Sequence, residues 1–181
     1  MTSNAHKTNL VLIGFMGSGK TTVARELSRL ISMPWLDTDV EIEKAAQMPV
    51  SEIFANHGEA YFRRLEHEIC RKISVLSHTI IATGGGMVLD IRNISALRQS
   101  SIFFYLQASP AKIYENIGAD NTRPLLNTGD RPGVIENLLA QRHPLYQQTA
   151  DYTICTEAFG TIDITLKIAE IAKAILNLRP E

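Results

Sequence analysis

The segment Gly14-Phe-Met-Gly-Ser-Gly-Lys-Thr21 has the residue types and spacing of a phosphate-binding loop. In this pattern, glycines let backbone N–H groups turn toward phosphates, the lysine meets the β- and γ-phosphates, and the threonine hydroxyl is a ligand for Mg²⁺. An apolar run precedes the loop and a helical pattern follows it, so a helix N-terminus adds positive potential. We therefore predict a nucleotide phosphate site formed by Gly17, Ser18, Gly19, Lys20, Thr21 and Thr22.

Two carboxylates stand at positions i and i+2 in Leu36-Asp37-Thr38-Asp39. Along an extended strand end, this spacing puts both on one face, and ligands of open α/β sheets bind beyond the carboxyl ends of the strands. Asp37 could then hold the water shell of a metal ion while Asp39 reaches an acceptor hydroxyl. A local explanation is equally open, because Thr38 and Glu41 have the pattern of a capping box that begins the next helix.

A second glycine-rich turn, Gly84-Gly85-Gly86, directly follows the apolar run Thr79–Thr83. Three glycines expose bare backbone at another strand end, which suits the close approach of a ligand. A tight turn with a purely structural role is the alternative.

Four arginines are candidates for binding a small anion. Arg63 and Arg64 lie in a helical stretch where i, i+4 ion pairs with Glu59 and Glu68 are possible. Such pairing accounts for Arg64, whereas Phe62 and Leu65 draw the Arg63 side of the helix toward the core. For Arg123 and Arg142, solvation alone is an open alternative.

Five apolar runs of strand length alternate with amphipathic segments of helix length. Strands are predicted at Leu10–Ile13, Trp35-Leu36, Thr79–Thr83, Ile102–Leu106 and Tyr152–Thr156, and helices at 20–32, 59–76, 90–99, 109–117, 131–148 and 160–178. Three of the runs are continuous rather than alternating, which is typical of parallel strands covered on both faces. This order predicts an α/β fold with a doubly wound, five-stranded parallel sheet flanked by helices.

One stretch fits no regular element. Residues 118–133 contain three glycines and two prolines, and loops of this length within a domain are usually functional or mobile. We predict a mobile lid here, with a plain surface loop as the alternative.

Length and composition set the remaining bounds. The 181 residues favour one domain, 1–181, and 45% hydrophobic with 20% charged residues is ordinary globular usage. A net charge of −1 gives no support to a nucleic-acid partner. The two isolated cysteines, Cys70 and Cys155, form neither a disulfide framework nor a metal motif. No signal peptide or membrane span is visible, so we expect a soluble protein of the reducing cytoplasm.

Taken together, these motifs resemble the shikimate kinase family. The resemblance is carried, in the family's order and spacing, by Gly14–Thr21, Leu36–Asp39, Gly58–Glu66, Gly84–Gly86, Arg123–Leu126 and Arg142–Tyr146. It implies the P-loop kinase fold and an enzyme that uses ATP with Mg²⁺. The implied reaction transfers the γ-phosphoryl group to the 3-hydroxyl of shikimate, giving shikimate 3-phosphate and ADP in aromatic amino-acid biosynthesis. It also implies a monomer.

The resemblance also implies residue roles. Asp39 would contact the accepting hydroxyl, while Arg63 and Arg142 would grip the substrate carboxylate and Gly85 would meet the ring hydroxyls. Arg123 would move in with the lid to the phosphates and act in catalysis with Lys20 and Asp39. Thr21 would bind Mg²⁺, with Asp37 behind it through water, and Glu66 would orient Arg63.

Two segments depart from the family pattern. Tyr114–Gly118 lacks an arginine that is often found near the adenine, and Thr156–Phe159 lacks a further basic residue. These differences leave the nucleotide preference open. Two alternatives remain: another P-loop metabolite kinase acting on gluconate or a nucleoside monophosphate, and a nucleotide-binding regulatory module without catalysis.

Overall fold

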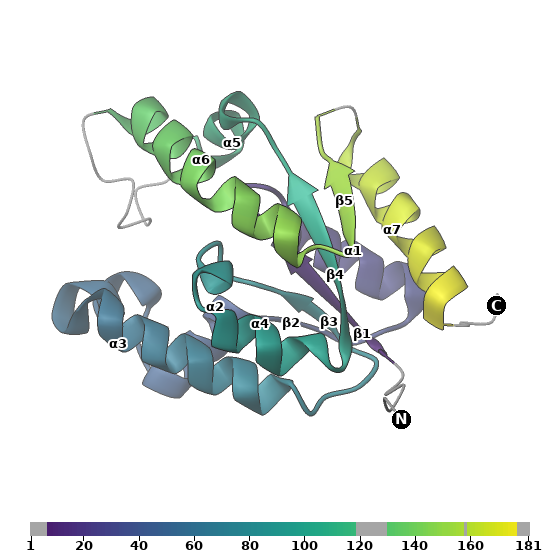
Figure 1. The fold of residues 1–181 in the computed structure, drawn as a ribbon, viewed down its shortest axis with the longest axis horizontal. Coiled ribbons are helices and arrows are strands. Elements are labelled where there is room, and N and C mark those ends of the chain that lie inside the picture. Colours follow the sequence, from purple (N-terminus) through teal and green to yellow (C-terminus); the bar gives the residue numbers. More distant parts are fainter. Residues whose placement is uncertain (1–6, 119–129, 158, 177–181) are drawn as a thin grey trace.

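A five-stranded, all-parallel sheet forms the centre of the molecule (Figure 1). The computed structural model describes residues 7–118, 130–157 and 159–176. The strands follow the spatial order β2-β3-β1-β4-β5. They are β1 (Asn9–Ile13), β2 (Trp35–Asp37), β3 (Ile80–Ala82), β4 (Ser101–Gln107) and β5 (Tyr152–Cys155). Every predicted strand is present, which confirms the doubly wound α/β class.

Helices cover both faces of the sheet. They are α1 (Lys20–Ile31), α2 (Thr38–Ala46), α3 (Val50–Ile73), the 3₁₀ turn η1 (Met87–Leu89), α4 (Ile91–Arg98), α5 (Pro110–Ile117), α6 (Arg131–Thr149) and α7 (Thr161–Leu176). All six predicted helices are observed. Their described ends lie within three residues of the prediction, except that α3 begins at Val50 rather than at residue 59; the predicted end of α7 at residue 178 lies outside the described residues. None of the helices within the described ranges has the length and apolar character of a membrane span.

The alternation of side chains along β1 divides the core into two layers. Val11 and Ile13 point into a cluster shared with α2, α3, α4, α5 and α6. Leu10 and Leu12 point into the opposite cluster, which α1 and α7 cover. All four side chains are fully buried, as expected for a central strand covered on both faces. Figure 1 shows α1 and α7 together on one side of the sheet, with α3, α4 and α6 on the other.

The segment between β2 and residue 59 corrects the sequence prediction. It contains α2 and the first turns of α3, neither of which the apolar pattern predicted as helix. Gly58, with φ 74° and ψ 173°, breaks the helical backbone inside α3. The predicted helix start at residue 59 therefore marks a kink rather than the beginning of the element. Residues 50–57 place an additional helical arm beside the sheet.

The strand order creates a crevice where the connections diverge. The chain leaves β1 for α1 on one face and leaves β3 for α4 on the other. Because β1 and β3 are neighbours, their carboxyl ends open between the two layers, where ligands bind in open α/β sheets. The phosphate-binding loop follows β1, and the turn Gly84–Gly86 follows β3.

Asn9 ties the amino-terminal ends of three strands together. Its side chain is fully buried. The amide donates to Leu76 O at 2.7 Å and to Ser100 Oγ at 3.3 Å, and its oxygen accepts from Thr79 N at 3.0 Å. These bonds join β1 to the segments that enter β3 and β4. They thereby help set the alignment of the three strands whose opposite ends carry the crevice.

Replacing Asn9 with alanine should lower the free energy of unfolding by about 2–4 kcal/mol, because Leu76 O and Thr79 N would lose their side-chain partner. Urea denaturation monitored by circular dichroism measures the change. Asn137→Ala, at an exposed position of α6, is the control and should change stability by less than about 0.5 kcal/mol. Equal losses in the two variants would contradict this role for Asn9.

Candidate active site

A cavity of about 840 Å³ lies at the carboxyl ends of β1, β2 and β3. Most of the residues predicted to do chemistry line this cavity: Gly17, Gly19, Lys20, Thr21, Thr22, Asp37, Asp39, Arg63, Gly85 and Arg142. Ser18 is buried within the same loop. Arg123 and the greater part of the predicted lid, 119–129, lie outside the described residues. Residues 131–133 of the predicted lid belong to α6.

The Lys20 side chain folds back onto the backbone of its own loop, Gly14–Thr21. Lys20 is the first residue of α1 and is only 7% exposed. Its Nζ donates to Gly14 O at 2.9 Å and Phe15 O at 2.8 Å. Carbonyl oxygens hold the ammonium group at the rim of the loop and compensate part of its desolvation. The charge is thus fixed where the N-terminus of α1 also favours an anion.

Thr21 and Asp37 bring two side-chain oxygens together beside the loop. Thr21 Oγ1 donates to Asp37 Oδ2 at 2.7 Å. Asp37 ends β2 and caps α2, because its Oδ1 accepts from Asp39 N at 3.0 Å. The cap is therefore Asp37. The alternative of a capping box on Thr38 and Glu41 is wrong in its residues, although a helix does begin at Thr38. The hydroxyl of Thr38 is instead buried and accepts from Gly84 N at 2.9 Å.

Asp39 reaches the cavity from a helix rather than from an extended strand. It lies in the first turn of α2, so the predicted i, i+2 arrangement along one strand face is wrong. The cavity nevertheless receives both carboxylates, because the helix begins directly at the strand end. A Cβ atom at position 84 would lie 2.5 Å from Asp39 Oδ1. Asp39 is thus packed against the bare backbone of the second glycine turn.

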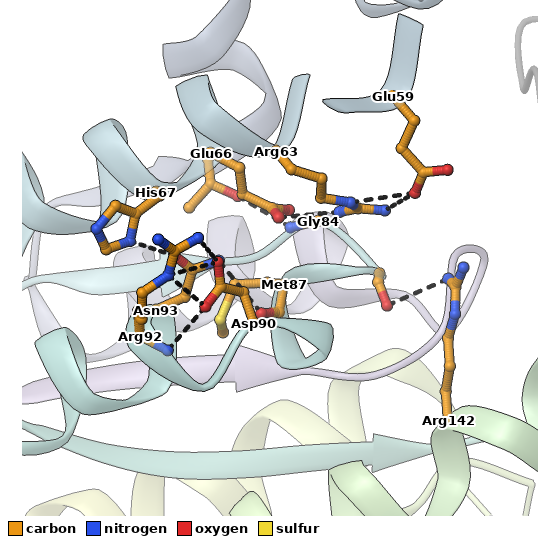
Figure 2. Close-up of polar contacts among 12 residues, drawn as sticks. Glu59, Arg63, Glu66, His67, Gly84, Met87, Asp90, Arg92, Asn93 and Arg142 are labelled. Atoms are coloured by element: carbon orange, nitrogen blue, oxygen red, sulfur yellow. Dashed lines mark hydrogen bonds and ion pairs between the residues drawn. The ribbon is translucent and has the colours of Figure 1, made fainter. Parts of the chain in front are cut away.

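Arg63 is held between two carboxylates of α3, as Figure 2 shows. Its guanidinium donates to Glu59 Oε1 at 3.0 Å and to Glu66 Oε2 at 2.9 Å. Both pairs follow helical spacing, and the Glu59 pair is the one predicted from i, i+4 spacing. The guanidinium also fills the space in which a side chain of residue 86 would stand. An unsubstituted Gly86 is therefore required for Arg63 to reach the turn.

Arg142 approaches the same turn from α6, on the opposite side (Figure 2). It is 5% exposed, and its Nη1 donates to Gly85 O at 3.4 Å. The guanidinium carbon also lies 5.6 Å from the centroid of the Phe15 ring, within cation–π range. Two arginines from different helices therefore converge on one glycine turn, and paired guanidinium groups of this kind suit a carboxylate.

Glu66 is the most deeply buried carboxylate of the site. Its side chain is fully buried, and Oε1 has no hydrogen-bond partner within the described residues. Burial raises the pKa of Glu66 to about 7 against the opposing effect of Arg63, and the nearby charges of Asp39 and Asp90 add to the rise. Glu66 thus contacts Arg63 as expected from the sequence. Its burial gives it a protonation equilibrium close to neutral pH.

A buried asparagine makes further polar contacts behind the glycine turn Gly84–Gly86. Asn93 is fully buried in α4, where its Nδ2 donates to Met87 O at 3.3 Å and its Oδ1 lies 3.0 Å from His67 Nδ1. These contacts link α3, α4 and η1, as Figure 2 shows. His67 lies next to Glu66 on α3, behind the site.

Several lining residues were not predicted. They come mainly from α2 and from the start of α3, which the sequence pattern did not predict as helices: Val40, Glu43, Pro49, Val50, Ser51 and Phe54. Phe54 also packs against Phe62, with ring centroids 4.9 Å apart. Asn116, in the segment that departs from the family pattern, donates from Nδ2 to Gly17 O at 2.8 Å. In the second such segment, Phe159 has the Lys167 ammonium 5.4 Å from its ring centroid.

Comparison with known proteins gives one consistent result. The family model described as shikimate kinase matches residues 16–177. A shikimate kinase from Caldanaerobacter subterraneus subsp. tengcongensis is 47% identical over 93% of this chain and 94% of the relative. Another, from Caldicellulosiruptor saccharolyticus, is 42% identical over 92% and 96% of the two chains.

A solved structure extends the likeness to three dimensions. The shikimate kinase from Acinetobacter baumannii, determined in complex with shikimate, superposes with a TM-score of 0.88. It is 34% identical and covers 92% of this chain and 93% of its own. With the phosphate-binding loop, two acidic residues and two arginines gathered in one cavity, and with these matches along nearly the whole chain, the protein belongs to the shikimate kinase family.

Proposed function

We propose that this protein transfers the γ-phosphoryl group of ATP to the 3-hydroxyl of shikimate, giving shikimate 3-phosphate and ADP. The observation that carries the proposal is the convergence of Asp39, Arg63 and Arg142 on one glycine turn, in the same cavity as Lys20. A monoanionic triol needs a cationic clamp for its carboxylate and acceptors for its hydroxyls. This cavity offers both beside a phosphate site.

At the phosphate end, loop N–H groups and Lys20 would bind the β- and γ-phosphates of ATP. Lys20 now donates to Gly14 O and Phe15 O, so its ammonium already lies at the mouth of the loop. Phosphoryl transfer depends mainly on positioning and charge neutralisation. The buried, fixed ammonium group of Lys20 supplies charge neutralisation with little reorganisation. We assign the remaining neutralisation to Arg123.

The pair Thr21 and Asp37 fits Mg²⁺. Thr21 Oγ1 and Asp37 Oδ2 lie 2.7 Å apart at the cavity wall. Mg²⁺ prefers oxygen ligands such as these while keeping several waters. Thr21 would bind the ion directly and Asp37 through water. When bound, the ion would neutralise charge on the phosphates. Asp37 also caps α2, which holds its carboxylate in place for this role.

At the acceptor end, Arg63 and Arg142 would bind the shikimate carboxylate from two sides. Gly85 would offer its backbone to a ring hydroxyl. Asp39 would accept a hydrogen bond from the 3-hydroxyl and orient it toward the γ-phosphorus, receiving the proton as the new bond forms. This role is supported by its place in the first turn of α2, against Gly84, because Arg63 and Arg142 approach the same glycine turn.

We propose that the enzyme acts as a monomer in the cytoplasm. Both cysteines are free, and burial raises the pKa of the Cys70 thiol to about 12. A thiol with that pKa is inert at neutral pH, which suits a reducing compartment.

A coupled ADP-release assay tests the proposed reaction. ADP release from ATP should depend on shikimate and require Mg²⁺. Gluconate and nucleoside monophosphates are the comparison acceptors. Phosphorylation of one of these in place of shikimate would favour another P-loop metabolite kinase. Tight ATP binding without turnover on any acceptor would favour a regulatory module.

Asp39→Asn should lower kcat by about 10²–10⁴-fold, because the amide cannot take the hydroxyl proton. The KM for ATP should stay near the wild-type value, since Asp39 does not belong to the phosphate-binding loop. Steady-state kinetics with both substrates varied measure the two effects. Glu170→Gln, the same change of charge at an exposed position of α7, is the control. An unchanged rate in Asp39→Asn would remove Asp39 from the mechanism.

Arg63→Ala should weaken shikimate binding by about 2–5 kcal/mol, as expected when one partner of a buried charge pair is lost. ATP binding should change little. Isothermal titration calorimetry measures both affinities, and a thermal melt verifies folding. Arg64→Ala is a matched control, because Arg64 is the adjacent residue of α3 but is exposed. Equal losses of affinity for ATP and shikimate would contradict the assignment of Arg63.

Glu66 should make stability fall as the pH rises from about 4.5 toward 7. Because its pKa is raised to about 7 in the native state, the folded protein keeps a proton that the unfolded chain has lost. Stability therefore falls across this range. Urea midpoints at pH 5 and pH 7.5 should differ less in Glu66→Gln than in the wild type. Glu68→Gln, exposed on the same helix, should retain the wild-type difference; loss of it in both variants would contradict the prediction.

A further inference from the structure

Tyr146 lies behind the glycine turn, one helical turn after Arg142 on α6. Its side chain is fully buried, and its hydroxyl donates to Gly85 O. Arg142 Nη1 donates to the same oxygen at 3.4 Å. A carbonyl oxygen has two lone pairs and can accept both bonds. Tyr146 does not line the cavity within the described residues, so any effect on substrate must pass through Gly85 or Arg142.

The Gly85 peptide has little freedom on its other side. A Cβ atom at position 85 would lie 3.0 Å from Met16 N and 3.6 Å from Gly14 O, both in the phosphate-binding loop. The turn is thus packed between that loop and α6. The Tyr146 hydroxyl makes the shorter of the two α6 hydrogen bonds to the carbonyl end of this peptide. The Arg142 guanidinium carbon also lies 5.6 Å from the centroid of the Phe15 ring. The phosphate-binding loop, the glycine turn and α6 therefore meet at Arg142 as well as at Gly85.

We propose that Tyr146 is a positioning residue that satisfies the Gly85 carbonyl and thereby leaves the Arg142 guanidinium available for the substrate carboxylate. This inference rests on the proposed role of Arg142. A buried carbonyl without a strong donor is costly. Without the Tyr146 hydroxyl, Gly85 O would be left with the 3.4 Å bond from Arg142 Nη1 and would draw the arginine closer. The substrate would then have to break this strengthened bond before Arg142 could bind its carboxylate.

The surroundings of Tyr146 keep its hydroxyl a donor at all working pH values. Burial raises its pKa well above the ordinary value of tyrosine. Its ring stacks on Tyr105, with centroids 5.0 Å apart. The Tyr105 hydroxyl points elsewhere, to His143 Nδ1 at 3.0 Å. The two tyrosines are therefore similar in burial and packing, but only one of them bonds to the glycine turn.

Removal of each hydroxyl in turn tests the proposal. Tyr146→Phe keeps the ring and its stack and should raise the shikimate KM about fivefold, as for the loss of one hydrogen bond. The kcat and the KM for ATP should stay near wild type. Tyr105→Phe, the matched control, should leave all three unchanged. Hydrogen exchange of the 83–89 backbone should rise in Tyr146→Phe and not in Tyr105→Phe.

A double-mutant comparison separates this proposal from the one on which it rests. If Tyr146 acts through Arg142, Tyr146→Phe should raise the shikimate KM much less in an Arg142→Ala background. An unchanged KM in Arg142→Ala itself would refute the proposed carboxylate clamp. A normal KM in Tyr146→Phe, with a raised one in Arg142→Ala, would overturn only the positioning role. Unfolding of Tyr146→Phe alone, or an equal rise of KM in Tyr105→Phe, would also overturn it in favour of a purely structural role.

Discussion

The site depends on one steric constraint, the absence of side chains on the turn that follows β3. A Cβ atom at position 84 would lie 2.5 Å from the carboxylate of Asp39, and one at position 86 would overlap the guanidinium of Arg63. Because the turn carries no side chains, α2 can bring Asp39 and α3 can bring Arg63 directly against its backbone. The parallel sheet makes this possible, because the carboxyl ends of β1, β2 and β3 lie side by side.

The charged groups gathered in this cavity lose part of their hydration, and pairing with neighbouring groups offsets that cost. A charge removed from water is costly unless it is paired or hydrogen-bonded. Lys20 is compensated by loop carbonyls, and Arg63 by Glu59 and Glu66. The 18 basic and 19 acidic residues of the chain give a net charge of −1, which conceals this separation. Overall charge is therefore uninformative about a small anionic substrate.

The parts of the fold that follow a regular pattern were predictable from sequence. Apolar runs, three of them continuous, marked all five strands, and the glycine–lysine motif marked the start of α1. The pattern failed between residues 38 and 58, because α2 is short and Gly58 interrupts α3. It also misplaced Asp39 on a strand, since a helix begins at Thr38 without an intervening loop. The family resemblance implied that Glu66 orients Arg63, but only tertiary packing reveals the complete burial of Glu66.

Helix α6 shows why functional residues escape an analysis based on hydrophobicity. Its buried positions follow helical spacing, but Arg142, Tyr146 and Thr149 occupy three of them. Each carries a polar group that needs a partner when buried. The first two find that partner in Gly85 O. A helix that covers an active site must bury polar groups on its inner face. The apolar stripe expected of a surface helix is therefore lost at the positions that matter to the chemistry.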